Sequence, residues 1–449
     1  MAACASAMSR SADRPRLAAL DVLRAVREDD AYTNLALPVA LERHRLDPRD
    51  AAFATELAAG TIRRQGTYDA VLAACASRPL KKIDPIVLDI LRLGAHQLLA
   101  MRVPAHAAIS TSVDLVRAAG KGSAAGFGNA VLRKVAARDL PGWLAQIAPD
   151  AAIRHSHPAW VVEELRRAVG DAELEALLAA DNEPPRVTLV ARPGRAERAE
   201  LPGDPTPYSP HGAVLAGGNP SAVPAVAEGR AGVQDEGSQL VALVLSAAEL
   251  DGPDRAWLDL CAGPGGKSAL LAGLAAERGA GLLAVERQHH RSRLVAKALA
   301  GADGVTGVLT ADGTNPPLRP RSFDRVLVDA PCTGLGALRR RPEARWRRKP
   351  EDLDTLVPLQ RLLLAAAIEL VRSGGAVVYA TCSPVLAETA EVVTATLEAR
   401  PDVELDDVRA LLPDVPDCDG PLARTVQLWP HRHGTDAMFM ALLRRSRHA

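Results

Sequence analysis

Two cysteines lie in short motifs, each directly after an apolar run of the kind that forms a buried strand. The sequence DAPCTG (residues 329–334) follows one run, at 323–328, and YATCSP (residues 379–384) follows another, at 375–378. Parallel strands buried on both faces read as continuous apolar runs, and open α/β sheets bind ligands beyond the carboxyl ends of their strands. The spacing therefore predicts that Cys332, Cys382 and Asp329 meet in one crevice.

These side chains suit the transfer of a methyl group to a carbon atom of a pyrimidine. C5 of cytosine is a poor nucleophile until a thiolate adds to C6; C5 then takes the methyl group and loses its proton, and the thiol is eliminated. The reaction needs a nucleophilic cysteine, an acid near N3 and a base for the C5 proton. Enzymes that methylate exocyclic amines typically carry (D/N)PP(Y/F) where this chain has DAPC.

A glycine-rich turn, CAGPGGKS (residues 261–268), follows a third apolar run at 256–260. A Walker A loop would need glycine at position 261 and a GxGxxG dinucleotide turn would need it at 268, but these positions are Cys261 and Ser268. A strand, a tight turn and a helix N-terminus remain, and they suit S-adenosylmethionine because its carboxylate can bind a helix N-terminus. Glu286, 20 residues after Gly266, is expected at the ribose hydroxyls, and Asp312 at the adenine.

The elements around these motifs alternate between strand and helix from residue 233 onward. Strands are expected at 256–260, 281–285, 305–311, 323–329 and 375–381, with helices at about 266–277, 289–300, 351–373 and 386–399. This alternation predicts a doubly wound, Rossmann-like parallel sheet. Two further strands are expected at 426–429 and 437–443, joined by a short turn.

The first part of the chain has only helical periodicity, and one of its helices is expected to open at Asp50. Residues 182–232 are rich in proline and glycine, which indicates loops, a small irregular subdomain or a linker. We therefore expect three parts: a helical bundle at 14–140, a small middle region at 150–230 and a catalytic domain at 233–447. The bundle could serve RNA binding or dimerisation.

The composition is that of a globular protein of 449 residues, with 48% hydrophobic and 24% charged residues and a formal net charge of zero. No CxxC pair and no Cys/His zinc spacing occurs, so reduced thiols, a cytoplasmic location and no metal are expected. We expect no membrane segment. Cys4, Cys75 and Cys418 are interpreted as small hydrophobes without a role in the chemistry.

Two polar clusters remain. The histidines of 431–433 are expected at the surface, because no further ligands stand at metal spacing. The run RRRPEARWRRK (residues 339–349) holds seven basic side chains and one acidic one. It could be only a solvated loop, but it follows the DAPCTG motif closely, and we expect it to contact RNA phosphates.

The catalytic motifs resemble those of the RNA (cytosine-5)-methyltransferases of the Nol/Nop/Sun superfamily. The resemblance runs from VQDEGSQLV (from residue 233) through CAGPGGKS, DAPCTG, RRRPEARW and YATCSP to HGTDAMF. The commoner form of the cofactor turn is CAAPGGKT. The stretches LDVLRAVREDDAYTNLAL, DPRDAAFATELAAGTIRR and FGNAVLRKV resemble the RNA-binding antitermination factor NusB. A NusB-like domain ahead of a class I methyltransferase domain is the layout of the bacterial 16S rRNA cytosine-5 methyltransferases of the Sun/Fmu type.

The resemblance implies a role for each motif residue. Cys382 would be the nucleophile, Cys332 would assist resolution of the covalent adduct, and Asp329 would contact both the base and the cofactor. S-adenosylmethionine would be held by Cys261, Ala262, Gly263, Pro264, Gly265, Gly266, Lys267, Glu286, Asp312 and Asp329. RNA would be met by Lys267, Arg339, Arg340, Arg341, Arg345, Arg347 and Arg348.

The expected enzyme is a monomer that methylates C5 of a flipped or unpaired cytosine in 16S rRNA, free or in an early small-subunit particle. Two alternatives stay open. A DNA cytosine-5 methyltransferase would share the chemistry but attack with Cys332. A non-catalytic RNA-binding or antitermination factor would bind RNA without binding the cofactor.

Overall fold

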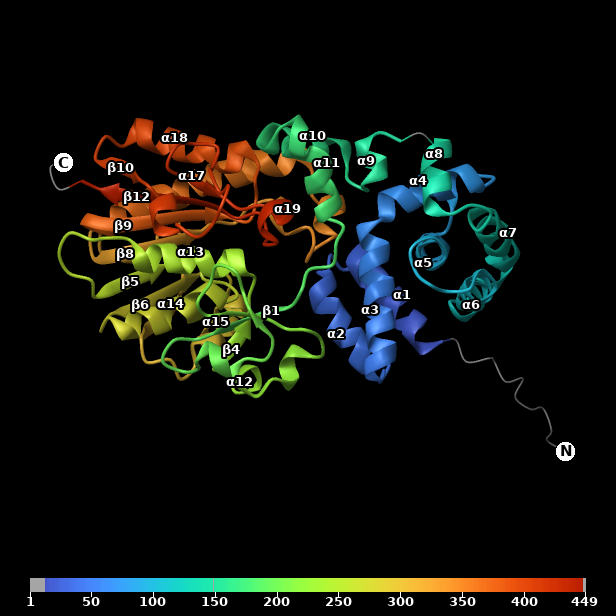
Figure 1. Cartoon of the computed structure of the whole chain (residues 1–449), viewed down its shortest axis with the longest axis horizontal. Coiled ribbons are helices and arrows are strands. Elements are labelled where there is room, and N and C mark those ends of the chain that lie inside the picture. Colours follow the sequence, from blue (N-terminus) through green and yellow to red (C-terminus); the bar gives the residue numbers. More distant parts are fainter. Residues whose placement is uncertain (1–12, 148, 447–449) are drawn as a thin grey trace. The chain divides into compact units, whose positions relative to one another are not determined.

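The computed structural model describes residues 13–147 and 149–446 of the chain. They form two compact units (Figure 1). One holds the described residues up to Glu163 together with Leu338–Arg347, and the other holds Glu164–Ala337 and the residues from Arg348 onward. The helical unit thus ends later than residue 140, and it takes in ten residues from the middle of the catalytic sequence.

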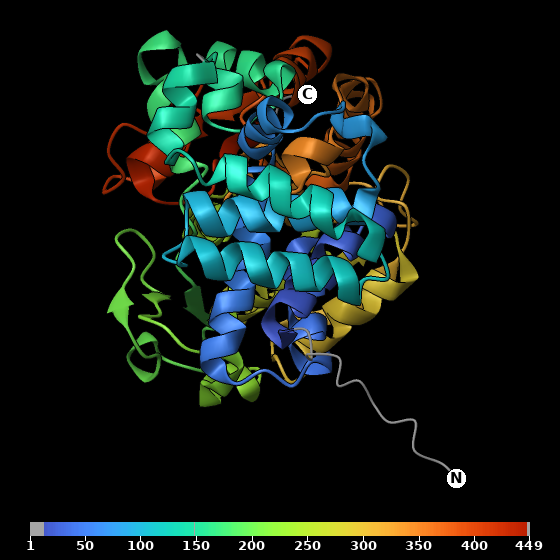
Figure 2. The ribbon, with the colours of Figure 1, turned by 90° about the vertical axis from the view of Figure 1, so that its right-hand side faces the viewer.

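Every regular element that the structure describes in the first unit is a helix, as predicted. These elements are α1 (Arg14–Glu28), α2 (Thr33–Arg43), α3 (Pro48–Arg63), α4 (Gln65–Cys75), η1 (Leu80–Lys82), α5 (Pro85–Leu99), α6 (Ala105–Ala118), η2 (Gly122–Ala124), α7 (Ala125–Val135), α8 (Leu140–Ile147), α9 (Ala151–Arg154) and the short α16 (Ala344–Arg347). Figure 2 shows the longer helices lying side by side. Their apolar faces enclose two buried clusters, one around Leu57 and Ile90 and the other around Tyr68 and Leu132.

Aspartate caps fix where several of these helices begin. Asp84 accepts hydrogen bonds from the backbone N–H groups of the first turn of α5, which is the usual role of an N-cap aspartate. The start of α3 differs from the prediction: Asp47 is the cap and Pro48 the first helical residue. Asp50 lies inside the first turn and donates its backbone N–H to Asp47, so it does not open the helix.

The second unit opens with two helices and a small sheet. The end of α10 (Ala159–Val169) and all of α11 (Asp171–Ala180) precede the proline- and glycine-rich stretch. That stretch holds four short strands, β1 (Thr188–Ala191), β2 (Asp204–Pro205), β3 (Gly212–Val214) and β4 (Ala231–Val233), with the short helices η3 (Arg198–Glu200), η4 (Pro220–Ala222) and α12 (Pro224–Ala227). The strands pair antiparallel in the order β2-β3-β1-β4. The stretch is therefore an ordered subdomain and not a linker.

The large sheet confirms the predicted α/β class. Its strands are β5 (Ala256–Asp259), β6 (Gly281–Glu286), β7 (Val305–Thr310), β8 (Phe323–Asp329), β9 (Val371–Thr381), β10 (Val403–Asp406), β11 (Val426–Gln427) and β12 (Phe439–Arg445). They run in the order β10-β12-β9-β8-β5-β6-β7, with β11 paired to β12. The five strands from β9 to β7 are parallel, and β12 is antiparallel to its neighbours.

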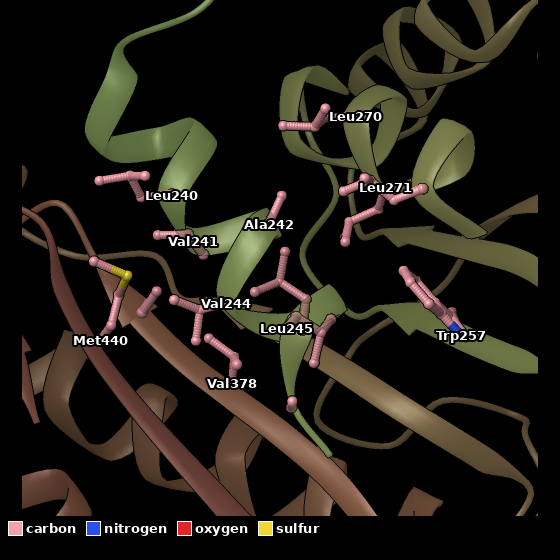
Figure 3. Close-up of a cluster of buried hydrophobic side chains, with 14 of the residues drawn as sticks. Leu240, Val241, Ala242, Val244, Leu245, Trp257, Leu270, Leu271, Val378 and Met440 are labelled. Carbon is pink, nitrogen blue, oxygen red and sulfur yellow. The ribbon is translucent and has the colours of Figure 1, made fainter. Parts of the chain in front are cut away.

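Helices cover both faces of this sheet. They are α13 (Glu236–Ala247), α14 (Gly266–Glu277), α15 (His289–Leu299), α17 (Leu353–Leu370) and α18 (Ala390–Ala399), with the short η5 (Leu335–Ala337), η6 (Pro350–Asp352), η7 (Leu386–Glu388), η8 (Arg409–Leu411) and α19 (Pro430–His433). On one face, Val244 and Leu245 of α13 lie over the sheet, near Val378 of β9 and Met440 of β12 (Figure 3). On the other face, Leu364 and Ile368 of α17 belong to the second large cluster. The sheet is thus buried on both sides, which explains the continuous apolar runs of its strands.

The C-terminal part departs from the prediction in detail. The two expected strands are present as β11 and β12, but the connection between them holds the helical turn α19, and β10 adds an edge strand that was not predicted. The helix predicted at 351–373 ends at Leu370, because Val371 already belongs to β9. These changes leave the carboxyl ends of β5, β8 and β9 where the sequence predicted them, within two residues.

Candidate active site

The two cysteine motifs and the glycine turn lie where three neighbouring parallel strands end. β5 precedes the turn, β8 ends at Asp329 and β9 ends at Thr381, and β8 lies between the other two strands. Asp329 pairs with Ala380 of β9, so the chain leaves both strands at the same level of the sheet. The structure therefore brings Asp329, Cys332 and Cys382 to one edge.

The two thiols touch. The Sγ atoms of Cys332 and Cys382 lie 3.5 Å apart, and both residues are partly buried. The hydrogen bond with Cys382, followed by burial, raises the pKa of Cys332 well above its ordinary value, and the charges of Glu388 and Asp329 add to the rise. This hydrogen bond and burial favour the protonated form of Cys332, and attack by Cys382 stays a prediction.

Lys267 brings a positive charge to the thiol pair. It lies in the first turn of α14, and its Nζ donates to Oδ2 of Asp329 at 2.8 Å. Burial opposes the ammonium, but the charge of Asp329 and this hydrogen bond outweigh burial and raise the pKa of Lys267, and a Cys382 thiolate raises it further. Because such an interaction is mutual, the Lys267 ammonium stabilises negative charge on the Cys382 sulfur.

The glycine turn brings backbone close to two other elements. A Cβ on Gly263 would lie 2.0 Å from Oε2 of Glu286, and one on Gly265 would lie 2.7 Å from the Cβ of Ala298. Gly265 also has a φ of +109°, which side chains rarely adopt, and α14 begins at the next residue. The turn therefore leaves no room for side chains at these two positions, and it leads into a helix N-terminus of the kind that binds carboxylates.

Glu286, at the end of β6, is buried beside this turn. Its Oε1 accepts the backbone N–H of Gln288, and its Oε2 lies 3.7 Å from Nε of Arg291. Arg291 also donates to the carbonyl oxygen of Gly263 at 2.6 Å, so one guanidinium joins the turn to the predicted ribose carboxylate. Arg291 was not predicted, because in the sequence it reads as one more charged residue on a helix surface.

Asp312 lies two residues beyond the end of β7 and is exposed. Its Oδ1 accepts hydrogen bonds from the backbone N–H and the hydroxyl of Thr314, and these bonds lower the pKa of Asp312. Oδ2 lies 3.8 Å from Nε of Arg287. The Asp312 carboxylate thus stabilises the loop to which it belongs. Its contact with adenine stays a prediction.

A second carboxylate lies under the glycine turn. Asp259 ends β5 and is completely buried; its Oδ2 accepts the hydroxyl of Ser268 at 2.6 Å and its Oδ1 the backbone N–H of Cys261 at 3.3 Å. Burial raises the pKa of Asp259 to about 7. Asp259 therefore holds the two ends of the turn together, a role that its place inside an apolar run did not reveal.

Known proteins are similar to this chain in sequence. A family model described as 16S rRNA methyltransferase RsmB/F matches residues 245–444, and the NusB family model matches residues 13–137. Ribosomal RNA small subunit methyltransferase B of Pseudomonas putida is 35% identical over 87% of this chain and 91% of its own length. The chain belongs to the RsmB/F family. A protein of Mycobacterium tuberculosis whose name describes it as a methyltransferase is 51% identical over 97% of both chains.

Solved structures agree with this fold. The crystal structure of PH0851 superposes with a TM-score of 0.80 and 23% identity, over 96% of this chain and 98% of that chain. NSun6 from Pyrococcus horikoshii, solved with SFG, gives a TM-score of 0.55 at 19% identity, over 65% of this chain and 98% of that chain. At such identities the likeness shows the fold alone.

The basic run of this RsmB/F chain is divided between the two units. Residues 338–347 fold with the helical unit, where the Arg345 side chain is fully buried and donates to the carbonyl oxygens of Arg63 and Ser156. Trp346 donates its indole N–H to the carbonyl oxygen of Ile62 at 2.8 Å. The segment is therefore an integral part of that unit and not a solvated loop.

Burial changes the roles that we expect for individual arginines of the run. Arg339 and Arg345 are buried, and Arg345 donates to protein carbonyl oxygens, so the structure does not support phosphate contacts for these two residues. Arg341 is exposed and lies over the ring of Tyr32, with Arg347 also near that ring. Arg348 returns to the catalytic unit and donates to the carbonyl oxygen of Thr333, directly after Cys332. Arg340, Arg341 and Arg347 keep their predicted RNA contacts as a proposal.

Other predicted positions lie away from this site or outside the described residues. Cys75 and Cys418 are buried, as expected of small hydrophobes, and Cys4 lies outside the described residues. The expectation of surface histidines is wrong: His433 is buried and bonded to the backbone of Trp429 and Pro416, and the side chain of His431 is only 8% exposed and is bonded to Glu173. In residues 13–147 and 149–446 no group of three His, Cys, Asp or Glu side chains is arranged to hold a metal. No helix in the described part of the chain is long and apolar enough to span a membrane.

Proposed function

We propose that this chain transfers a methyl group from S-adenosylmethionine to C5 of a cytosine in 16S rRNA, through a covalent bond between Cys382 and C6. The observation that carries the proposal is the pair of thiols 3.5 Å apart beside the Lys267–Asp329 ion pair. Membership of the RsmB/F family, whose model is described as a 16S rRNA methyltransferase, supports the substrate class. The cytoplasmic monomer is the form in which we propose that the enzyme acts.

The side chains divide the reaction between them. Cys382 adds to C6 as the thiolate, which the Lys267 ammonium favours. Asp329 contacts the N3 side of the base in this proposal, and Lys267 can supply a proton through the hydrogen bond that it donates to Asp329. After methyl transfer a base removes the C5 proton, and expulsion of the Cys382 thiolate restores the ring. We assign Cys332 to this second half, because its sulfur touches that of Cys382.

The glycine turn fits the proposed cofactor. When bound, S-adenosylmethionine supplies the electrophilic methyl group. The turn leads into the N-terminus of α14, whose backbone N–H groups can bind the carboxylate of the methionine end. Glu286 is held beside the same turn by Arg291 and can accept hydroxyl groups of a ribose.

The choice of nucleophile separates this proposal from a DNA cytosine-5 methyltransferase that attacks with Cys332. The favourable interaction between the Lys267 ammonium and a Cys382 thiolate supports Cys382 as the attacking sulfur. A second discriminating feature is the helical unit, whose residues 13–137 match the NusB family. We propose that this unit, with Arg340, Arg341 and Arg347, provides RNA contacts.

The test is bisulfite sequencing of 16S rRNA from a strain lacking the gene, complemented with wild type, Cys382→Ser or Cys332→Ser. We expect one methylated cytosine to disappear in the deletion strain and to return with wild type but not with Cys382→Ser. An unchanged 16S pattern in the deletion strain would exclude this substrate. Restoration by Cys382→Ser but not by Cys332→Ser would support the DNA-type nucleophile instead.

A further inference from the structure

A buried carboxylate lies behind the two cysteine loops. Glu388 ends the 3-10 helix η7 and is completely buried. Its Oε1 accepts the backbone N–H of Thr333 at 2.8 Å, and its Oε2 accepts the Thr333 hydroxyl. Thr333 directly follows Cys332, so this one carboxylate holds the Cys332 loop by two hydrogen bonds.

The same carboxylate reaches the second loop through Thr333. The Thr333 hydroxyl lies 3.0 Å from the hydroxyl of Ser383, which directly follows Cys382. Since the single hydroxyl proton of Thr333 is donated to Glu388, the Thr333 oxygen accepts the proton of Ser383. The chain of contacts Glu388–Thr333–Ser383 therefore links the residues next to the two thiols. The backbone adds one more link, from the N–H of Gly336 to the carbonyl oxygen of Cys382 at 2.9 Å.

Gln360 of α17 fixes the other side of the Cys332 loop. Its Nε2 donates to Oε1 of Glu388 at 3.0 Å and to the carbonyl oxygen of Pro331 at 2.9 Å. Cys332 thus lies between two residues, Pro331 and Thr333, that are both tied to the Glu388–Gln360 pair. The three donors to Glu388 are neutral groups, and a buried carboxylate in such surroundings is costly unless its hydrogen bonds are kept.

We propose that Glu388 is a positioning residue that sets the spacing between the Cys332 and Cys382 thiols, and so determines whether Cys332 can act on an adduct formed at Cys382. The first part rests only on the hydrogen bonds around Thr333, and the second part rests on the proposed two-thiol reaction. Glu388 itself lies behind the loops and acts through Thr333 and Ser383.

The spacing of the thiols can be measured without any substrate. In a glutathione redox buffer, two thiols and one oxidised glutathione give the Cys332–Cys382 disulfide and two reduced glutathiones, and the equilibrium reports how well the sulfurs are held together. Peptide mapping by mass spectrometry of the full chain would quantify this disulfide. We expect Thr333→Val and Glu388→Gln to lower its equilibrium constant by about tenfold, the equivalent of one lost hydrogen bond.

Matched variants separate positioning from a general loss of stability. Thr333→Ser keeps the hydroxyl and should keep the wild-type equilibrium constant. Thr396→Val removes a buried hydroxyl on α18 that bonds only within its helix, to the carbonyl oxygen of Val392, and should also leave the constant unchanged. If Glu388→Gln fails to fold, the disulfide equilibrium constant of Thr333→Val alone tests the proposal. A wild-type constant in folded Thr333→Val would overturn the proposal.

A second measurement follows the consequence for turnover. With RNA and cofactor present, we expect Thr333→Val and Glu388→Gln to accumulate a denaturation-resistant protein–RNA complex and to lower kcat more than they change KM, whereas weakened folding alone would only reduce the amount of active enzyme. The disulfide equilibrium constant could fall while none of the variants, Cys332→Ser included, forms a denaturation-resistant complex with RNA. That result would support the spacing role of Glu388 and contradict the proposed covalent chemistry. If a variant changes the disulfide equilibrium constant but releases RNA as wild type does, the second part of the proposal is wrong.

Discussion

The Nζ atom of Lys267 and the Oδ2 atom of Asp329 lie 2.8 Å apart, although one residue lies in the first turn of a helix and the other ends a strand 62 positions later. This ion pair stands beside both thiols, since the charge of Asp329 acts on Cys332 and a Cys382 thiolate acts on Lys267. The expectation from the sequence placed Lys267 at the cofactor and at RNA phosphates. In the structure its Nζ donates to Asp329, and its contacts with the cofactor and with RNA stay predictions.

Removal of this charge should make Cys382 less reactive. We expect Lys267→Met to slow alkylation of Cys382 by iodoacetamide at neutral pH by about tenfold, since one pKa unit of lost thiolate stabilisation corresponds to that factor. Mass spectrometry of the peptide that holds Cys382 would measure the rate. Lys297→Met, at an exposed position on α15, is the control. Equal rates in wild type and Lys267→Met would contradict the proposed stabilisation of the thiolate.

The buried Asp259 should make stability depend on pH. Its pKa of about 7 in the folded chain lies above the ordinary value of 3.8, so its contribution is fully present below about pH 4 and is lost as the pH rises through 7. The change is on the order of 4 kcal/mol for three pKa units. Relative to wild type, Asp259→Asn should therefore gain stability between pH 4 and pH 7, measured by chemical unfolding across that range.

The exposed carboxylate of Asp303 provides the control for this titration. Asp303→Asn should change stability little, because this side chain lies in solvent. A constant difference between wild type and Asp259→Asn from pH 4 to 7 would show that Asp259 does not titrate as its burial implies.

A single methyl group on the glycine turn should weaken cofactor binding. Gly263→Ala places a Cβ 2.0 Å from Oε2 of Glu286, so the turn or the carboxylate must move. We expect the Kd for S-adenosylmethionine to rise at least about tenfold, the equivalent of 1.4 kcal/mol, by calorimetry. Gly217→Ala, where a Cβ would meet nothing within 4 Å, should bind as wild type does. Unchanged binding by Gly263→Ala would place the cofactor elsewhere.

The arginines of residues 338–347 should fall into two classes. For exposed Arg341, Arg341→Gln should weaken RNA binding and reduce the dependence of log K on log salt by about 0.7 for one lost phosphate contact. For buried Arg345, Arg345→Gln should leave that salt dependence unchanged and cost roughly 2–4 kcal/mol of unfolding free energy, because the carbonyl oxygens of Arg63 and Ser156 lose a charged donor. RNA titrations at several salt concentrations would measure the salt dependence, and thermal unfolding would measure the stability of both variants. A reduced salt dependence in Arg345→Gln but not in Arg341→Gln would refute the assignment.

The site could be predicted from the sequence wherever local pattern determines position. The apolar runs before Asp329 and Cys382 mark buried strands, and the glycines at 263 and 265 stand where backbone approaches other elements. These features depend on residues that are close together in the sequence, so one amino-acid sequence is enough to predict them.

The remainder depends on partners far along the chain. Arg345 reads as a surface charge, but its acceptor at Arg63 is 282 residues away. Glu388 reads as part of a helix, and its role appears only because Thr333, 55 residues earlier, reaches it. Arg291 and Asp259 are similar cases, since a charge in a helix or strand does not reveal which loop it will hold. Long-range hydrogen bonds of this kind have no periodicity that a sequence displays.

The placement of Leu338–Arg347 also bears on how this protein could be divided or recombined. The chain leaves the catalytic unit after Ala337 and rejoins it at Arg348, and in between it supplies α16 to the helical unit. A truncation at residue 163 would remove Trp346 and Arg345 from the N-terminal fragment. The other fragment would keep Leu338–Arg347 without the helical unit with which this segment folds. Neither half is a module that a single cut can release, so an exchange of helical units between relatives would have to replace two stretches of sequence together.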